Sequence, residues 1–177
     1  MSWIHFHLLV NHFPIVGSCI LLVLLIVSLF WPDPTYRKII LCLVMFVTIV
    51  TYLANMSGPF AEHQMRAANL IASRDAHGFI QLHEANASWT LFLSYLAGLL
   101  ALIGLFVKGI IKWVIPCLLV SMLVMTGFAA WTSLLGGLIS YPEIRSDAIS
   151  KVATEYVVPR LQLGPGKKQP RKNQNQD

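Results

Sequence analysis

Long apolar runs alternate with short polar segments over most of this chain. No charged residue occurs from Phe13 to Trp31, and about 20 apolar residues, at about 1.5 Å each, cross the hydrocarbon core of a bilayer. Similar runs follow farther along the chain. The pattern predicts membrane-spanning helices at about residues 10–31, 38–56, 86–107 and 110–137.

The predicted spans are joined by connections of unequal length. Segments 32–37 and 108–112 are very short, and short connections make neighbouring helices antiparallel. We therefore predict an all-α membrane protein, an antiparallel up-down-up-down bundle of four transmembrane helices over residues 1–141. The polar residues 142–177 are expected to form an extramembrane C-terminal tail.

The connection between the second and third spans is the longest. Ser57-Gly58-Pro59 reads as the end of the second span, because proline disfavours continuation of a helix. Apolar residues then recur at helical spacing, which predicts an amphipathic helix near 60–74 on the membrane face. A further helix is expected to start near Ala76 and run into the third span.

Composition supports a membrane protein. The chain is 56% hydrophobic and 12% charged, whereas soluble domains are about 25% charged. The formal net charge of +5 is concentrated in the tail, which favours contact with lipid headgroups or an acidic partner. Binding of nucleic acid is therefore not expected. The sequence C-x-x-C-H is absent, which argues against covalently attached haem.

Basic residues in the short connections indicate an orientation. Arg37, Lys38, Lys108 and Lys112 lie in or beside these segments, and cytoplasmic loops are enriched in such residues. The termini and segment 57–85 are then expected on the periplasmic side of a bacterial inner membrane.

All histidines fall on one side of this predicted topology. The chain has 6 histidines, at positions 5, 7, 12, 63, 77 and 83. His12 lies at the mouth of the first span and His83 at the mouth of the third, so the two can face each other from different helices. Two neutral imidazoles on facing helices are what b-type haem requires as axial ligands.

We therefore predict haem b near the outer membrane face, with His12 and His83 ligating its iron. A second haem could use His5 or His7 with His63 or His77. Arg66 is a candidate partner for haem propionates. A zinc or copper site made by His12, His63, His83 and Glu84 is an alternative, although no compact metal-binding motif supports it.

The predicted function is that of a membrane electron-transfer subunit in a larger complex. It would pass electrons between quinol and a cytochrome partner, such as a c-type cytochrome, rather than act as a stand-alone enzyme. The predicted spans carry no internal charges that could build an ion pathway, which argues against a pump or transporter. The alternative classes are a non-catalytic structural or assembly subunit, whose histidines only make interface hydrogen bonds, and a protein with a periplasmic-face histidine metal site without haem.

The chain also resembles a family of small four-helix bacterial membrane proteins of unknown function. The resemblance covers about residues 5–141 and rests on H-x-x-x-x-H-F-P-I-V-G at 7–17, S-G-P-F-A-E at 57–62, H-E-x-N-A at 83–87 and G-G-L-I-S-Y at 136–141. It implies haem association or a redox-partner role, as in some members. Many members have a histidine after the final tyrosine, where this chain has Pro142 and Glu143.

Overall fold

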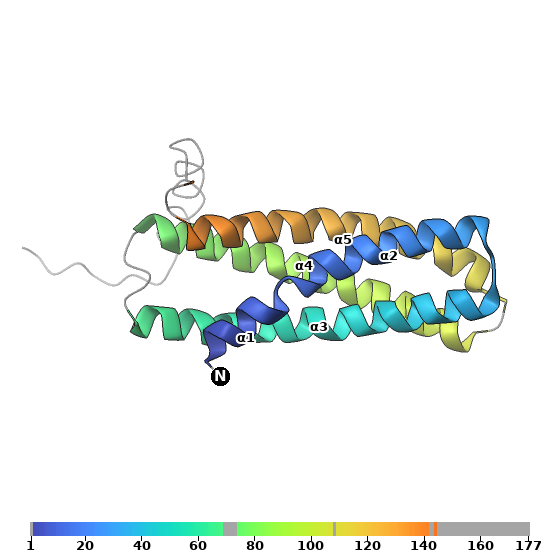
Figure 1. Cartoon of the computed structure of the whole chain (residues 1–177), viewed down its shortest axis with the longest axis horizontal. Helices are drawn as coiled ribbons and strands as arrows, with labels where there is room; N and C mark the ends of the chain where they lie inside the picture. Colours follow the sequence, from blue (N-terminus) through green and yellow to red (C-terminus); the bar gives the residue numbers. More distant parts are fainter. Residues whose placement is uncertain (1, 69–73, 108, 142–143, 145–177) are drawn as a thin grey trace, which may run out of the picture.

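The computed structural model of the chain describes residues 2–68, 74–107, 109–141 and 144. Regular structure in this part is helical throughout, and the long helices lie side by side along the long axis of the molecule (Figure 1). The elements are α1 (Trp3–Val10), α2 (Phe13–Phe30), α3 (Pro34–Ala67), α4 (Arg74–Phe106) and α5 (Ile111–Ser140).

These helices provide 4 candidate spans that are long and apolar enough to cross a membrane. They are Trp3–Phe30, Pro34–Ala67, His77–Phe106 and Ile111–Ser140. This confirms the predicted all-α architecture with four such helices. Apart from Tyr141 and Ile144, the residues that follow α5 lie outside the described part, and so does nearly all of the predicted tail.

A kink divides the first span into α1 and α2. Pro14 occupies the first turn of α2, where it has no N–H to donate to the carbonyl of Val10 one turn earlier. Asn11 and His12 form the turn between the helices. As a result α1 packs against α3, whereas α2 packs against both α3 and α5.

The helix α3 corrects one prediction. The span was expected to end at Ser57–Pro59, with a separate surface helix beyond it, but α3 runs without interruption through Pro59 to Ala67. Pro59 removes a single hydrogen bond, and membrane helices tolerate proline where neighbouring helices and hydroxyl side chains compensate. The helix α1 packs alongside this part of α3, where His7 contacts Ser57. Residues 69–73 of the predicted surface helix lie outside the described part.

Close packing joins α3 to α4. A Cβ placed on Gly98 would lie 2.9 Å from the hydroxyl oxygen of Thr48, so α4 approaches α3 as closely as glycine permits. The Thr48 hydroxyl donates a shared hydrogen bond to two carbonyl oxygens, that of Val44 in its own helix at 3.0 Å and that of Ser94 in α4 at 3.1 Å. The surrounding core is formed by side chains of α2, α3, α4 and α5.

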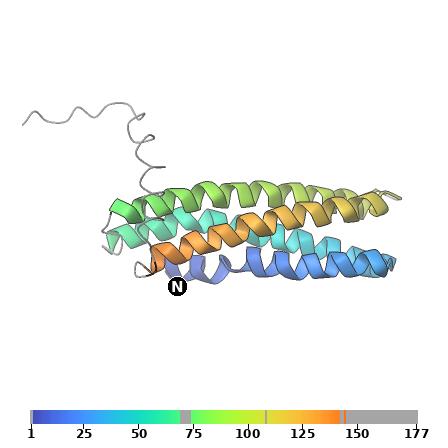
Figure 2. The same ribbon diagram turned by 90° about the horizontal axis from the view of Figure 1, so that it is seen from above.

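The two ends of the bundle differ in character. At one end lie the α2–α3 and α4–α5 connections, with the exposed Trp31 and Trp113. The opposite end, here called the histidine end, comprises α1, residues 57–67 of α3, 77–86 of α4 and 132–140 of α5. Figure 2 shows the helices alongside one another in the perpendicular view, with α1, the end of α3, the start of α4 and the end of α5 at the same end.

Candidate histidine site at one end of the bundle

His7 is fixed by α3. Its Nδ1 lies 2.9 Å from the hydroxyl oxygen of Ser57. When that hydroxyl donates its single proton to the Ala54 carbonyl, 2.9 Å away, the serine oxygen accepts from Nδ1 of His7. In this arrangement of the neutral ring, Nε2 carries the lone pair.

The attachment of α1 to α3 has further supports. The backbone N–H of Ile4 donates to Oε1 of Gln64 at 3.3 Å. Trp3 stacks on Phe60 with ring centroids 4.7 Å apart. These contacts lie on the N-terminal side of His7 along α1, so they hold this helix, and its imidazole, against α3.

His83 is held in a matching way by α5. Its Nδ1 lies 2.9 Å from the carbonyl oxygen of Thr132. A carbonyl only accepts hydrogen bonds, so Nδ1 carries the proton and Nε2 again carries the lone pair. A Cβ on Gly136 would lie 3.4 Å from Cε1 of the ring. The ring edge therefore rests against a helix surface that has no side chain at that position.

A polar network fixes the register of α4 against α5 beside His83. The side-chain amide of Asn86 donates to the Phe128 carbonyl at 3.2 Å and to the Thr132 hydroxyl at 3.1 Å. The Thr90 hydroxyl bonds the Asn86 carbonyl at 3.0 Å. Asn86 thus clamps the residue whose carbonyl accepts from His83.

The rings of His7 and His83 lie close enough to interact electrostatically, and both side chains are half-buried. They belong to different pairs of packed helices, α1/α3 and α4/α5, and α3 also packs against α4. Figure 1 shows these two pairs separating toward the histidine end. Each ring has a hydrogen-bond partner at Nδ1, Ser57 for His7 and the Thr132 carbonyl for His83. We call these residues the histidine pair.

Charged side chains connect α3 to α4 at the same end. Glu84 of α4 lies near Glu62 and Arg66 of α3. Arg66 donates through Nε to Oε1 of Glu62 at 2.8 Å and through Nη2 to the same oxygen. Glu62, Arg66 and Glu84 therefore form a charged cluster between α3 and α4 at this end.

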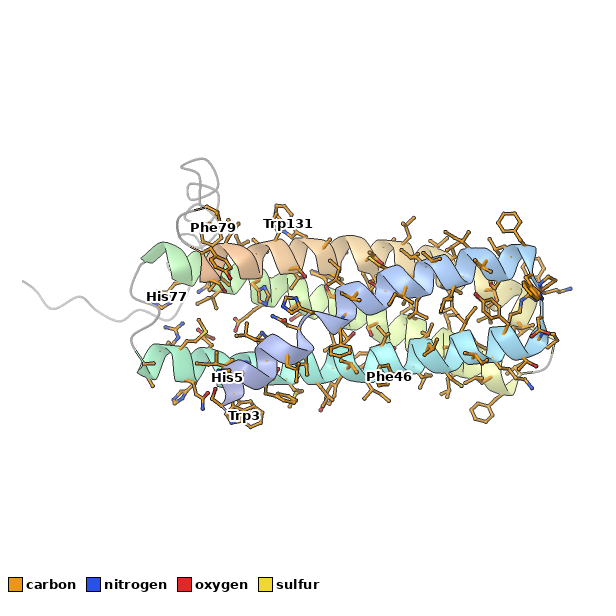
Figure 3. The ribbon with its side chains drawn as sticks, viewed as in Figure 1. Trp3, His5, Phe46, His77, Phe79 and Trp131 are labelled. Atoms are coloured by element: carbon orange, nitrogen blue, oxygen red, sulfur yellow. The ribbon has the colours of Figure 1, made fainter. Side chains whose placement is uncertain are left out.

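The other predicted site residues lie apart from the pair. His12 is exposed at the N-cap position of α2, and His63 is exposed on α3. His5 is exposed, with Nδ1 2.6 Å from the Ser2 hydroxyl. Figure 3 shows His5 on α1 and His77 on α4. Both lie farther toward the histidine end than Trp131 of α5. The structure thus brings His7, rather than His12, toward His83, and haem ligation by any of them stays a prediction.

Within the described part of the chain, no group of three or more His, Cys, Asp or Glu side chains is arranged to hold a metal ion. The predicted set His12, His63, His83 and Glu84 therefore does not converge there. Zinc sites need three or four protein ligands, so the histidine pair alone does not provide one.

Sequence reasoning missed several residues that shape the site. Ser57 and Thr132 bond the two rings, and Gly58 and Gly136 lie beside them; Ser57, Gly58 and Gly136 fall in the motifs of the family resemblance, but no role was predicted for any of the four. The available signals were these motifs and the position of Ser57-Gly58 and Gly136 at the same predicted membrane face as the histidines.

Comparison of the chain with protein-family models, with curated proteins and with solved structures finds no match. The family resemblance noted above therefore rests on its short motifs alone.

Proposed function

We propose that the chain is a membrane redox subunit that holds one b-type haem at the histidine end, with His7 and His83 as axial ligands. The haem would lie between the α1/α3 pair and the α4/α5 pair. It would supply one-electron exchange at the membrane surface, within a larger complex. This assignment replaces His12 by His7 and keeps His83.

One observation carries the proposal: each ring of the histidine pair is oriented through Nδ1 and leaves Nε2 for a ligand. His7 donates to Ser57, and His83 donates to the Thr132 carbonyl. Histidines that bind metals donate their second ring N–H to a carbonyl, carboxylate or similar acceptor, which fixes the tautomer and the ring plane. The two rings also come from separate helix pairs, as ligation from opposite sides of a haem requires.

The surrounding residues fit this group. The macrocycle itself supplies four nitrogen ligands, so two imidazoles complete the iron site without further protein ligands. A Cβ added to Gly58 would lie 3.7 Å from Cε1 of His7, its nearest atom. A Cβ added to Gly136 would lie 3.4 Å from Cε1 of His83. Larger residues at these positions would crowd the rings. Arg66, at the same end, is a candidate partner for a propionate.

The proposal includes the arrangement in the membrane. The helices would run up-down-up-down across the bilayer, with the short connections in the cytoplasm and the histidine end on the periplasmic side. Arg37, Lys38 and Lys112 near the short connections support this orientation.

The test is a dithionite-reduced minus oxidised absorption spectrum of the chain purified in mild detergent, with haem quantified against protein. We expect a sharp α-band of a low-spin bis-imidazole b haem at about one haem per chain. His7→Ala and His83→Ala should each lose this band. A flat spectrum from folded, haem-supplied protein would overturn the proposal.

His12→Ala and His63→Ala are the matched controls, because both residues are exposed at the same end. They should keep the spectrum. Loss of the band in His12→Ala with retention in His7→Ala would instead support ligation by His12. Loss of assembly with partner subunits, without any pigment in the parent protein, would favour the structural class of function.

A further inference from the structure

The helices are longer than a bilayer requires. The helix α3 has 34 residues, which is about 51 Å at 1.5 Å per residue. The hydrocarbon core is about 30 Å thick. Even a tilt of about 40°, the top of the usual range, leaves α3 spanning about 39 Å along the membrane normal. Part of this helix must therefore lie outside the hydrocarbon.

Tryptophans mark where the hydrocarbon ends. Trp113 and Trp131 are 67% and 55% exposed on α5, and 18 residues of helix place them about 27 Å apart along its axis. Tryptophan is enriched at both membrane–water interfaces, and this separation is close to the thickness of the core. Trp89, on α4, is similarly exposed at 58%. One boundary thus lies near Trp113, and the other near Trp89 and Trp131.

The excess length lies at the histidine end. The helix α3 begins at Pro34, three residues after the exposed Trp31, so little of it can project at that end. Its charge-free stretch runs from Ile39 to Ala61, about 35 Å of helix. Glu62 and Arg66 follow. The last turns of α3 therefore lie beyond the hydrocarbon.

The histidine pair sits at this boundary. Thr132, which accepts from His83, is the residue after Trp131. His83 itself precedes Trp89 by six residues on α4, about 9 Å farther out. Figure 3 shows Phe79 and His77, still earlier in α4, lying beyond Trp131 toward this end.

From this placement we infer that the histidine pair lies in the interfacial layer, with the ends of α3 and α4 projecting into water, and that it exchanges electrons with a water-soluble one-electron carrier. The partner class rests on the proposed function, whereas the membrane placement does not. The carrier and the bound cofactor would exchange one electron, one being oxidised as the other is reduced, without bond formation. A quinol dissolved in the hydrocarbon would instead approach the histidine pair from the side that faces the membrane interior.

The placement can be measured without haem. Cys19, Cys42 and Cys117 are replaced by alanine, and single cysteines are introduced at exposed positions. His63→Cys lies beyond the proposed boundary, whereas Ile49→Cys and Leu99→Cys lie inside it on α3 and α4; these three native residues are all exposed on the protein. Each variant is placed in lipid nanodiscs, which leave both faces open to water, and treated with a sulfonated maleimide.

His63→Cys should label rapidly, with the other two variants slower by on the order of 100-fold, because hydrocarbon excludes both the thiolate and the charged reagent. In detergent that admits the reagent, all three should label at similar rates. Slow labelling of His63→Cys in nanodiscs would place the histidine end within the bilayer and overturn the inference.

The partner class is tested on the haem-loaded, dithionite-reduced protein in the same nanodiscs. Oxidation by ferricyanide, an anion confined to water, is compared with oxidation by a long-chain quinone confined to lipid. Faster oxidation by ferricyanide is expected, and faster oxidation by the quinone would contradict the partner class. Absence of haem would refute the proposed function while leaving the labelling result intact.

Discussion

Gly98→Ala should destabilise the bundle by forcing α3 and α4 apart. The added methyl group would lie 2.9 Å from the hydroxyl oxygen and 3.0 Å from the methyl carbon of Thr48. Thr48 cannot simply rotate, because its hydroxyl is held by the carbonyls of Val44 and Ser94 and its χ1 angle is restricted by β-branching. Overpacking of this kind costs about 1–3 kcal/mol.

Gly127→Ala is the matched control. It adds the same methyl group within a long helix, but no heavy atom lies within 4 Å of the new Cβ. Both substitutions gain the same preference of alanine over glycine in a helix, about 0.8–1 kcal/mol in water, and this gain cancels when the variants are compared. Gly98→Ala should therefore be less stable than Gly127→Ala by the overpacking cost, about 2 kcal/mol.

The assay is equilibrium unfolding in mixed micelles with an increasing fraction of SDS, followed by circular dichroism. A double variant that also carries Thr48→Ala should recover part of the loss, because it removes the atoms that the methyl group meets, and the resulting cycle measures the coupling. If Gly98→Ala and Gly127→Ala differ by less than about 0.5 kcal/mol, as ordinary surface substitutions do, the close approach of α4 to α3 at this position is refuted.

Two further substitutions test the supports of the histidine pair. Pro14→Ala should restore a helical hydrogen bond at the kink and lower the yield of cross-linking by a short bismaleimide between cysteines at Ile4 and Gln64, because the Ile4 backbone N–H bonds the Gln64 side chain across α1 and α3. An unchanged yield would mean that packing, not Pro14, sets the bend. Asn86→Ala removes two hydrogen bonds to α5 and should cost about 0.6–1.7 kcal/mol in the same unfolding assay. Ser88→Ala is the control, because the exposed hydroxyl of Ser88 bonds the Glu84 carbonyl within its own helix, and its stability should not change. Equal losses of stability in the two variants would mean that the bonds of Asn86 to α5 contribute nothing specific.

The apolar runs predicted the number and type of the long helices because hydrophobic length is a local property of the sequence. The end of α3 was not predictable in this way. Ser57-Gly58-Pro59 is a stop signal when read locally, but α1 packs over this segment and His7 bonds Ser57. A contact between residues 50 positions apart therefore decides whether the helix continues.

The choice between His7 and His12 depended on a similar non-local fact. Both residues lie near the start of the first span, and the sequence alone does not decide which of them faces His83. The kink before Pro14 turns α1 onto α3, which half-buries His7 and leaves His12 exposed at the bend. The acceptor of His83 was hidden for another reason: it is the backbone carbonyl of Thr132, and a carbonyl group is present at every position of any sequence.

The way each ring is held has a consequence for biosynthesis. His7 takes its hydrogen-bond partner from α3, within the first 67 residues, and His83 takes its partner from α5, within residues 74–140. Each translated half of the chain therefore contains one imidazole together with the group that orients it. If the chain were made as two separate polypeptides, split within residues 69–73, each would contain one imidazole and its hydrogen-bond partner. Their association in the membrane would then be the step that brings the two imidazoles together.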